Sequence, residues 1–220
     1  MKMSKEARPD PSRTSRSFQG PLFLLRHGVI RSDGCRRYIG WQDLALSDVG
    51  LAQARRWADY FSGAALKNIY CSDLVRCLET ARIIGARCSL EPKVVPELRE
   101  IHLGAWDGRR FDTIRSLYPK DFETRGDHIA EHRPPGGESF HDLQDRVWPV
   151  FREIAQRLSG PTLVVTHAGV IRVLLSRILG MPLANLFAIR QDHGALNIIE
   201  GRPENWRIQA VNLQFYDISG

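Results

Sequence analysis

Two short apolar runs in this chain each end on a histidine, and this repeated pattern constrains both its fold and its chemistry. Leu22-Phe23-Leu24-Leu25 leads into Arg26-His27-Gly28, and Leu163-Val164-Val165-Thr166 leads into His167-Ala168-Gly169. Apolar runs of this length, followed by small residues, are typical of buried strands. Open α/β folds bind their ligands at the carboxyl ends of such strands. The pattern therefore predicts two strand-end histidines that can serve one ligand site.

Short apolar segments alternate with amphipathic segments along the rest of the chain. We expect strands at about 21–26, 68–71, 94–95, 162–166, 196–200 and 206–211. We expect helices at about 48–61, from Ser72 onward, and at about 111–117, 120–125, 139–158 and 170–179. Ser47, Ser72 and Ser139 are the candidate N-caps, the last in a capping box with Asp142. This alternation predicts an α/β fold with three layers, α/β/α, around a mainly parallel central sheet that could end in an antiparallel pair.

The ends and the middle of the chain differ in composition. Residues 1–20 lack apolar periodicity and carry five Lys or Arg against two acidic residues, which predicts a disordered basic tail. Residues 21–220 are then expected to form a single domain. The segment of about 102–138 is rich in Gly and Pro, as lids and binding loops often are. A packed surface excursion without a role is the alternative for this segment.

Charge and cysteine usage exclude several classes of protein. A formal net charge of +6 suits an anionic small molecule, whereas nucleic-acid binding is not expected because no basic run with interleaved aromatics occurs. No run of about 18 apolar residues is present, so we expect no membrane contact. The four cysteines form no C-x-x-C pair, which indicates reduced thiols in a cytoplasmic protein and no metal site.

Phosphate-ester chemistry without a metal needs a nucleophile, cations for the phosphoryl oxygens and an acid for the departing oxygen. A neutral imidazole is a competent nucleophile near pH 7 because its ordinary pKa is about 6.5. His27 is the candidate nucleophile. Arg26 and Arg76 can hold phosphate oxygens through forked hydrogen bonds, and His167 adds a donor if it is protonated.

Glu100 is the candidate acid, because a carboxyl group that faces an anionic phosphate away from water retains a proton more easily. Glu97 and Asp107 are its rivals. Each site residue also has a structural alternative. A strand-end histidine can be a hydrogen-bonded part of the structure, Arg76 can pair with Glu79 or Asp73 on a solvated helix face, and Glu100 can be surface charge.

These residues belong to a set of motifs that covers most of the chain. The motifs are Leu25-Arg26-His27-Gly28, Tyr38-Ile39-Gly40-Trp41, Cys71-Ser72-Asp73-Leu74-x-Arg76, Leu98-Arg99-Glu100 and Val165-Thr166-His167-Ala168-Gly169. In them the chain, from about Leu22 to Asn212, resembles the histidine phosphatase superfamily, which includes the cofactor-dependent phosphoglycerate mutases. The resemblance implies a phosphoglycerate mutase-like fold and a reaction that needs neither metal nor cofactor. It implies that His27 forms a phosphohistidine, that Arg26, Arg76 and His167 hold the phosphate, and that Glu100 donates the proton.

Within that superfamily the chain is most similar to the alpha-ribazole phosphatases, through Tyr38-Ile39-Gly40, Arg125-Gly126-Asp127 and Pro135-Gly136-Gly137-Glu138-Ser139-Phe140. The function expected is therefore hydrolysis of alpha-ribazole 5′-phosphate or a similar small sugar or nucleotide phosphate. Phosphoryl transfer of the phosphoglycerate mutase type and a non-catalytic phospho-ligand binding module are the alternatives. A homodimer is possible.

Substrate contacts are expected beyond the catalytic set. The candidates are Gly28 and Ala168 beside the two histidines, and Arg36, Arg37, Tyr38, His102 and Arg133 for the leaving group. Val29 and Asp33 depart from the family pattern. A carboxylate near a bound phosphate repels it, so Asp33 should turn away or pair with Arg36 or Arg37.

Overall fold

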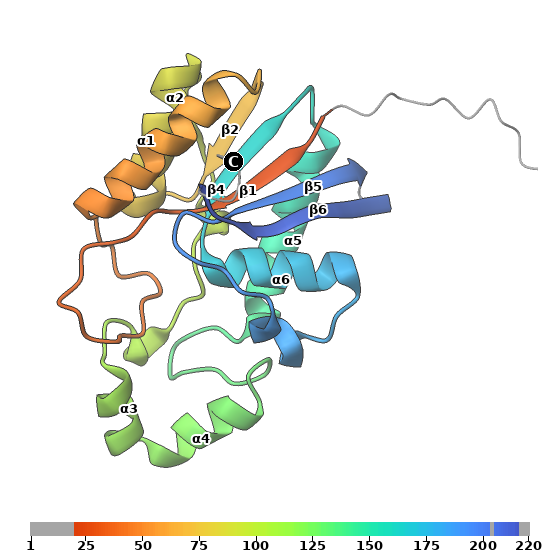
Figure 1. The fold of residues 1–220 in the computed structure, drawn as a ribbon. Coiled ribbons are helices and arrows are strands. Elements are labelled where there is room, and N and C mark those ends of the chain that lie inside the picture. Colours follow the sequence, from red (N-terminus) through yellow and green to blue (C-terminus); the bar gives the residue numbers. More distant parts are fainter. Residues whose placement is uncertain (1–19, 203–204, 216–220) are drawn as a thin grey trace, which may run out of the picture.

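The computed structural model describes residues 20–202 and 205–215, and these residues form one six-stranded mixed sheet between two layers of helices (Figure 1). The strands are β1 (Leu22–Arg26), β2 (Asn68–Cys71), β3 (Lys93–Val94), β4 (Thr162–Thr166), β5 (Leu196–Arg202) and β6 (Asn205–Leu213). Their order is β3-β2-β4-β1-β5-β6, with β1 to β4 parallel. The predicted α/β fold is confirmed. The predicted tail at residues 1–20 lies, apart from residue 20, outside the described residues.

The helices occupy both faces of the sheet and one outlying region. They are α1 (Asp48–Ser62), α2 (Val75–Cys88), α3 (Phe111–Leu117), α4 (Pro119–Asp127), α5 (Phe140–Gln156) and α6 (Ala168–Leu179). Figure 1 shows α1 and α2 on one face, α5 and α6 on the other, and α3 and α4 apart from the sheet at the bottom of the view. None of these helices has the length and apolar character that crossing a membrane requires.

The alternation of side chains along β1 explains why helices cover both faces of the sheet. On β1, Phe23 and Leu25 pack with Trp57 and the other apolar residues of α1 and α2. Leu22 and Leu24 point to the opposite face, into the core formed with α5 and α6. Because successive side chains of a strand face opposite sides, both faces of β1 are apolar and both are covered. Polar residues are therefore confined to the ends of the strand.

Two of the three predicted N-cap residues cap a helix in the structure. Ser47 caps α1 by accepting the Gly50 N–H, and Ser139 and Asp142 form the capping box of α5. The prediction for Ser72 is wrong, because α2 begins three residues later and Leu74 takes the N-cap position without a side-chain bond. The Ser72 hydroxyl is left available for another contact, which it makes in the site described below.

The last two strands run against β1, and this direction matters for the site. β5 pairs antiparallel with β1, with Leu196 opposite Leu25, and β6 pairs antiparallel with β5. An antiparallel neighbour begins at the edge where β1 ends. The loop before β5 is consequently held beside His27, through the bond from the Gly194 N–H to the His27 carbonyl (3.0 Å).

A close contact between two backbone segments fixes the loop after β1. A Cβ atom at Gly50 would lie 2.1 Å from the Val29 carbonyl oxygen, and one at Gly28 would lie 2.6 Å from the Gly50 oxygen. These distances are too short for any side chain. The first turn of α1 therefore supports the loop that carries His27.

The Gly50→Ala substitution should lower the free energy of unfolding by about 1–3 kcal/mol, because it forces this contact apart. It should also displace the loop that carries His27, since Val29 lies two residues after that histidine. Gly63→Ala is the matched control, because its Cβ would meet no heavy atom closer than 3.9 Å. Urea denaturation of both variants measures the difference, and equal losses would show that the contact does not constrain the loop.

Candidate active site

The sheet brings the two strand-end histidines together. β1 and β4 are adjacent and parallel, with Arg26 opposite Thr166, so His27 and His167 follow them at the same edge. The His27 N–H donates to the Thr166 carbonyl (3.0 Å), and the two imidazole rings lie 5.2 Å apart between centroids. Both side chains are buried, at 4% and 0% exposure.

The His27 ring is held as a neutral imidazole with one free nitrogen. Its Nδ1 lies 2.8 Å from the Gly28 carbonyl oxygen. A carbonyl can only accept, so Nδ1 carries the hydrogen and Nε2 keeps its lone pair. Burial, together with the nearby His167, Arg26 and Arg76, lowers the pKa of His27 well below its ordinary value. This nitrogen can therefore act as a nucleophile without first losing a proton.

Arg76 stands in the first turn of α2 and is almost fully buried. Its Nη2 donates to the Gly40 carbonyl (2.7 Å) and its Nη1 to the Gln42 carbonyl (2.8 Å). Its Nε donates to Nδ1 of His167 (3.3 Å). The two carboxylates that could have paired with it are used elsewhere. Arg76 is thus held by neutral groups and keeps its positive charge for a ligand.

The alternative of Arg76 on a solvated face is therefore wrong, for two reasons beyond its burial. Glu79 accepts the Leu46 N–H (2.8 Å), and Asp73 forms an ion pair with Arg99. That ion pair lowers the pKa of Asp73.

His167 is also neutral in this arrangement. Because its Nδ1 accepts from Arg76, Nε2 carries the hydrogen and donates to the Ser72 hydroxyl (2.9 Å). Burial and the charges of Arg76 and Arg26 lower its pKa well below the ordinary value. Cys77 Sγ lies 3.4 Å from the same nitrogen. His167 is consequently a neutral donor in the free protein, and the protonated form considered from the sequence is not the resting form.

The Arg26 guanidinium is fixed by the loop before β5. Its Nη1 donates to the Gln191 carbonyl (2.7 Å) and its Nη2 to Nε2 of His193 (2.9 Å). Burial lowers the pKa of Arg26 to about 10 and that of His193 to about 3. Sequence reasoning missed His193, whose ring lies 5.4 Å from that of His27. The antiparallel direction of β5 is the signal that could have placed it there.

Glu100 lies in the loop after the short turn Pro96–Leu98, and its carboxyl group contacts the first turn of α6. Its Oε2 accepts the Gly169 N–H (3.0 Å), and its Oε1 accepts the Ile101 N–H (2.9 Å). A Cβ atom at position 169 would lie 2.2 Å from Oε1, so only glycine leaves room for this carboxyl group. Of its two rivals, Glu97 is exposed on the short turn Pro96–Leu98. Asp107 is fully engaged, as described next.

The Asp107 carboxylate orders the loop of residues 40–42, whose carbonyls bind Arg76. Its carboxylate accepts the N–H groups of Gly40, Trp41 and Gln42, each at 2.8 Å. The carbonyls of Gly40 and Gln42 are the acceptors of the Arg76 guanidinium. These three bonds commit the Asp107 carboxylate to the loop backbone and not to a substrate. Asp107 therefore positions Arg76 through the intervening peptide groups.

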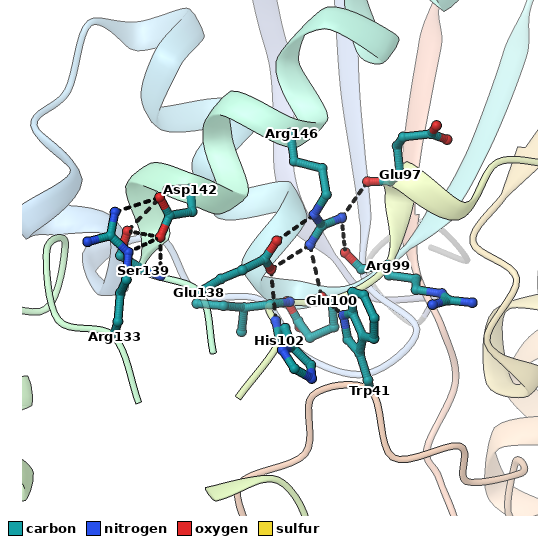
Figure 2. A network of polar contacts seen from close by, with 11 residues as sticks. Trp41, Glu97, Arg99, Glu100, His102, Arg133, Glu138, Ser139, Asp142 and Arg146 are labelled. Carbon is teal, nitrogen blue, oxygen red and sulfur yellow. Dashed lines mark hydrogen bonds and ion pairs between the residues drawn. The ribbon is translucent and has the colours of Figure 1, made fainter. Parts of the chain in front are cut away.

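A second network fixes the backbone at Glu100 (Figure 2). Arg146 donates to the carbonyls of Glu97 (2.6 Å), Arg99 (3.1 Å) and Glu100 (3.1 Å), and to the Glu138 carboxylate. The indole Nε1 of Trp41 donates to the Glu100 carbonyl as well (2.7 Å). One guanidinium thus binds three carbonyls of a segment that has no strand or helix beyond the short 3-10 turn Pro96–Leu98.

A cavity of about 410 Å³ opens beside Glu100. Among the residues expected to contact substrate, its lining includes Arg36, Arg37, Tyr38 and Ala168. Its remaining walls are mostly apolar, from Phe111, Phe122, Ile129, Phe140 and Phe187. A leaving group protonated by Glu100 would lie in this cavity.

Two of the expected leaving-group contacts lie outside this lining. The His102 ring packs against the Trp41 ring with 4.5 Å between the centroids, and Arg133 forms an ion pair with Asp142 (Figure 2). Asp33 pairs with Arg37 at 2.6 Å, and hydrogen bonds from Arg37 and the Cys35 N–H lower its pKa. The pairing expected for this carboxylate is therefore present. Within the described ranges, no group of three or more His, Cys, Asp or Glu side chains could hold a metal ion.

Comparison with known proteins gives the family. A sequence profile described as histidine phosphatase superfamily (branch 1) matches residues 22–214. The chain belongs to this superfamily. Phosphoglycerate mutase-like protein 4 of Arabidopsis thaliana is 35% identical over 160 residues, 71% of this chain and 70% of that protein. Adenosylcobalamin/alpha-ribazole phosphatase of Escherichia coli is 28% identical over 180 residues, 81% of this chain and 89% of that protein.

Solved structures agree with this assignment. The mycobacterial glucosyl-3-phosphoglycerate phosphatase complexed with VO3 superposes with a TM-score of 0.80 at 30% identity, covering 88% of this chain and 99% of that one. The phosphoglycerate mutase-like fold expected from the sequence is confirmed. This histidine phosphatase is accordingly an enzyme of the class that hydrolyses phosphoric monoesters.

The buried histidines of this phosphatase predict a loss of stability in acid. Below about pH 6.5 the unfolded chain protonates His27, His167 and His193, whereas the folded protein, with their pKa values lowered, keeps them neutral. Unfolding then takes up protons, so the free energy of unfolding should fall as the pH falls. Each histidine contributes a slope of up to about 1.4 kcal/mol per pH unit.

Chemical denaturation between pH 6 and pH 5 measures this slope. His193→Gln should reduce it by roughly 1.4 kcal/mol per pH unit relative to the unsubstituted protein. An undiminished slope in that variant would show that His193 is protonated in the folded state.

Proposed function

We propose that the protein hydrolyses a small phosphate monoester through a phosphohistidine formed on His27. The observation that carries this proposal is the state of the His27 ring, neutral and with Nε2 free, among the cationic Arg26 and Arg76 and the donor His167. A dianionic phosphoryl group placed there would meet two guanidinium groups, with the Glu100 carboxyl group beside it. Donors fixed in this way typically contribute about 10²- to 10³-fold each in rate.

The reaction would run in two balanced steps. Nε2 of His27 attacks phosphorus, the P–N bond forms, the ester P–O bond breaks, and Glu100 gives its proton to the departing oxygen. The Gly28 carbonyl accepts a hydrogen bond from Nδ1 and so stabilises the positive charge on the phosphorylated ring. Water then attacks phosphorus, a new P–O bond forms while the P–N bond breaks, and Glu100 takes a proton from that water. Inorganic phosphate leaves, and Nε2 of His27 regains its lone pair.

For the substrate we propose a small sugar or nucleotide phosphate, with alpha-ribazole 5′-phosphate as the first ester to examine. Two relatives that carry that activity in their names are 28% and 29% identical over 81% and 82% of this chain. The cavity beside Glu100, with its aromatic walls, has the size of a sugar or nucleoside. We further propose that residues 21–220 act as one cytoplasmic domain and that the 102–138 segment covers the substrate.

Phosphoryl transfer of the mutase type is the second candidate, because relatives named as mutases or mutase-like proteins reach 31–35% identity. The same site would then return the phosphoryl group to a second hydroxyl instead of to water. The two outcomes differ in their product. Hydrolysis releases inorganic phosphate, whereas transfer interconverts 2- and 3-phosphoglycerate without net release.

The test is phosphate release in EDTA from alpha-ribazole 5′-phosphate, 3-phosphoglycerate and p-nitrophenyl phosphate, with His27→Ala alongside. We expect release that the substitution abolishes, and an acid-labile phosphohistidine in rapidly quenched samples. Activity retained in His27→Ala would contradict the mechanism. Release from p-nitrophenyl phosphate alone would keep the chemistry and reject the ribazole ester, and interconversion without release would establish the mutase.

The phosphate pocket makes a separate prediction about two arginines. Arg76→Ala should lower kcat/KM by at least about 10²-fold, because it removes a buried cation that contacts the phosphoryl group in this scheme. Arg56→Ala should change it by less than about 2-fold, since Arg56 is exposed on α1. Steady-state kinetics with p-nitrophenyl phosphate compares them, and similar losses would remove Arg76 from the pocket.

A further inference from the structure

The cavity beside Glu100 contains a charge that the proposed reaction leaves unused. Its lining joins Glu100, Ala168 and Gly169 of the reacting centre to residues of α3 and α4. The part of the ester that departs would therefore contact this second group of residues. Four arginines also line the cavity, and they differ in how their charge is satisfied.

Three of these arginines have their charge or their N–H groups satisfied by a carboxylate, by solvent or by a backbone carbonyl. Arg37 forms the ion pair with Asp33, and Arg36 is exposed to solvent. Arg172 donates its Nε to the Ile189 carbonyl (2.8 Å). None of the three is both buried and lacking a partner for a guanidinium nitrogen.

The fourth, Arg125, is different. It lies on α4, is 9% exposed, and its guanidinium carbon is 5.7 Å from the ring centroids of both Tyr38 and Phe140. Its Nη1 is buried without a hydrogen-bond partner. Within residues 20–202 and 205–215, no carboxylate forms an ion pair with it. In this part of the chain, its polar side-chain contact is with the Tyr38 hydroxyl, which is neutral.

A buried guanidinium in this setting is costly, because desolvation is not compensated by an opposite charge. Burial accordingly lowers the pKa of Arg125. A carboxylate or phosphate oxygen arriving in the cavity would supply the missing charge. A guanidinium can also bind such a group through two parallel N–H bonds, and the flanking Tyr38 and Phe140 rings limit its movement.

We propose that this cavity is a leaving-group subsite in which Arg125 binds a second anionic group of the substrate, a carboxylate or a phosphate. The inference rests on the proposed function, because the cavity matters only if an ester is split beside Glu100. It narrows the substrate class to esters that carry a negative charge besides the phosphate being removed. The neutral nucleoside of alpha-ribazole 5′-phosphate would leave Arg125 unpaired.

Two pairs of esters test the subsite. 3-Phosphoglycerate differs from glycerol 3-phosphate by a carboxylate, and fructose 1,6-bisphosphate differs from fructose 6-phosphate by a phosphate. In at least one pair, the protein should prefer the anion-bearing ester by about 10-fold or more in kcat/KM, since hydrogen bonds between charged groups have this size. The pair that shows the preference identifies the anion as a carboxylate or a phosphate.

Substitution then assigns the preference to one side chain. Arg125→Gln should lower kcat/KM for the preferred ester by about 10- to 100-fold and that for p-nitrophenyl phosphate by less than about 3-fold. Arg115→Gln, an exposed arginine on the neighbouring α3, is the matched control and should change neither. If Arg125→Gln does not fold, Arg125→Lys, which keeps the charge without the forked geometry, should reduce the preference by about 3-fold or more.

Equal kcat/KM values within both pairs would overturn the subsite, as would an equal loss on all esters in a folded Arg125→Gln or an undiminished preference in Arg125→Lys. These results differ from failure of the proposed function. If the unsubstituted protein released no phosphate from p-nitrophenyl phosphate and formed no phosphohistidine, the chemistry itself would be wrong.

Discussion

The buried Arg76 guanidinium is the feature on which the rest of the site depends. An ion pair with a carboxylate would have stabilised it locally but would have cancelled its charge. Here the carbonyls of Gly40 and Gln42 and the imidazole of His167 satisfy its N–H groups. Neutral acceptors compensate the desolvation through hydrogen bonds while the net charge remains. Burial, together with this charge and that of Arg26, lowers the pKa of both imidazoles and keeps them neutral. The two guanidinium charges also attract an anionic ester.

Such an arrangement needs support from farther away, because carbonyls of an irregular loop have no fixed direction of their own. Asp107 supplies it by binding three successive N–H groups of residues 40–42. Arg146 acts similarly on the carbonyls around Glu100. In both cases one forked or bidentate charged group orders several peptide groups at once. Asp107 and Arg146 therefore serve the site by ordering loop backbone, and the residues that the structure describes form no ion pair with the proposed reacting groups.

The sequence predicted those parts of the site that sit on regular structure. Apolar runs place His27 and His167 at strand ends, and parallel pairing of neighbouring strands brings them together. Sequence patterns did not place the residues whose positions depend on contacts between loops distant in the sequence. Ser72 was assigned to a helix cap although it contacts His167, and His193 reaches the site because β5 runs antiparallel to β1. His102 and Arg133 resembled ligand contacts, but local partners, Trp41 and Asp142, engage them.

The residues assigned to the reaction and the residues that line the substrate cavity lie on different parts of the fold. Four of the groups assigned to phosphoryl transfer lie at the ends of β1 and β4 and in the first turn of α2, and Glu100 lies in a loop that bonds to the start of α6. Several of the groups that line the leaving-group cavity come from the loop after β1 and from α3 and α4, and these two helices stand apart from the sheet (Figure 1). Changes in these outlying segments alter cavity walls without disturbing strand register. A solved structure near 30% identity with a TM-score of 0.80 can thus share the chemistry with this chain while its ester differs. Substrate assignment must accordingly come from residues such as Arg125 rather than from the histidine motifs.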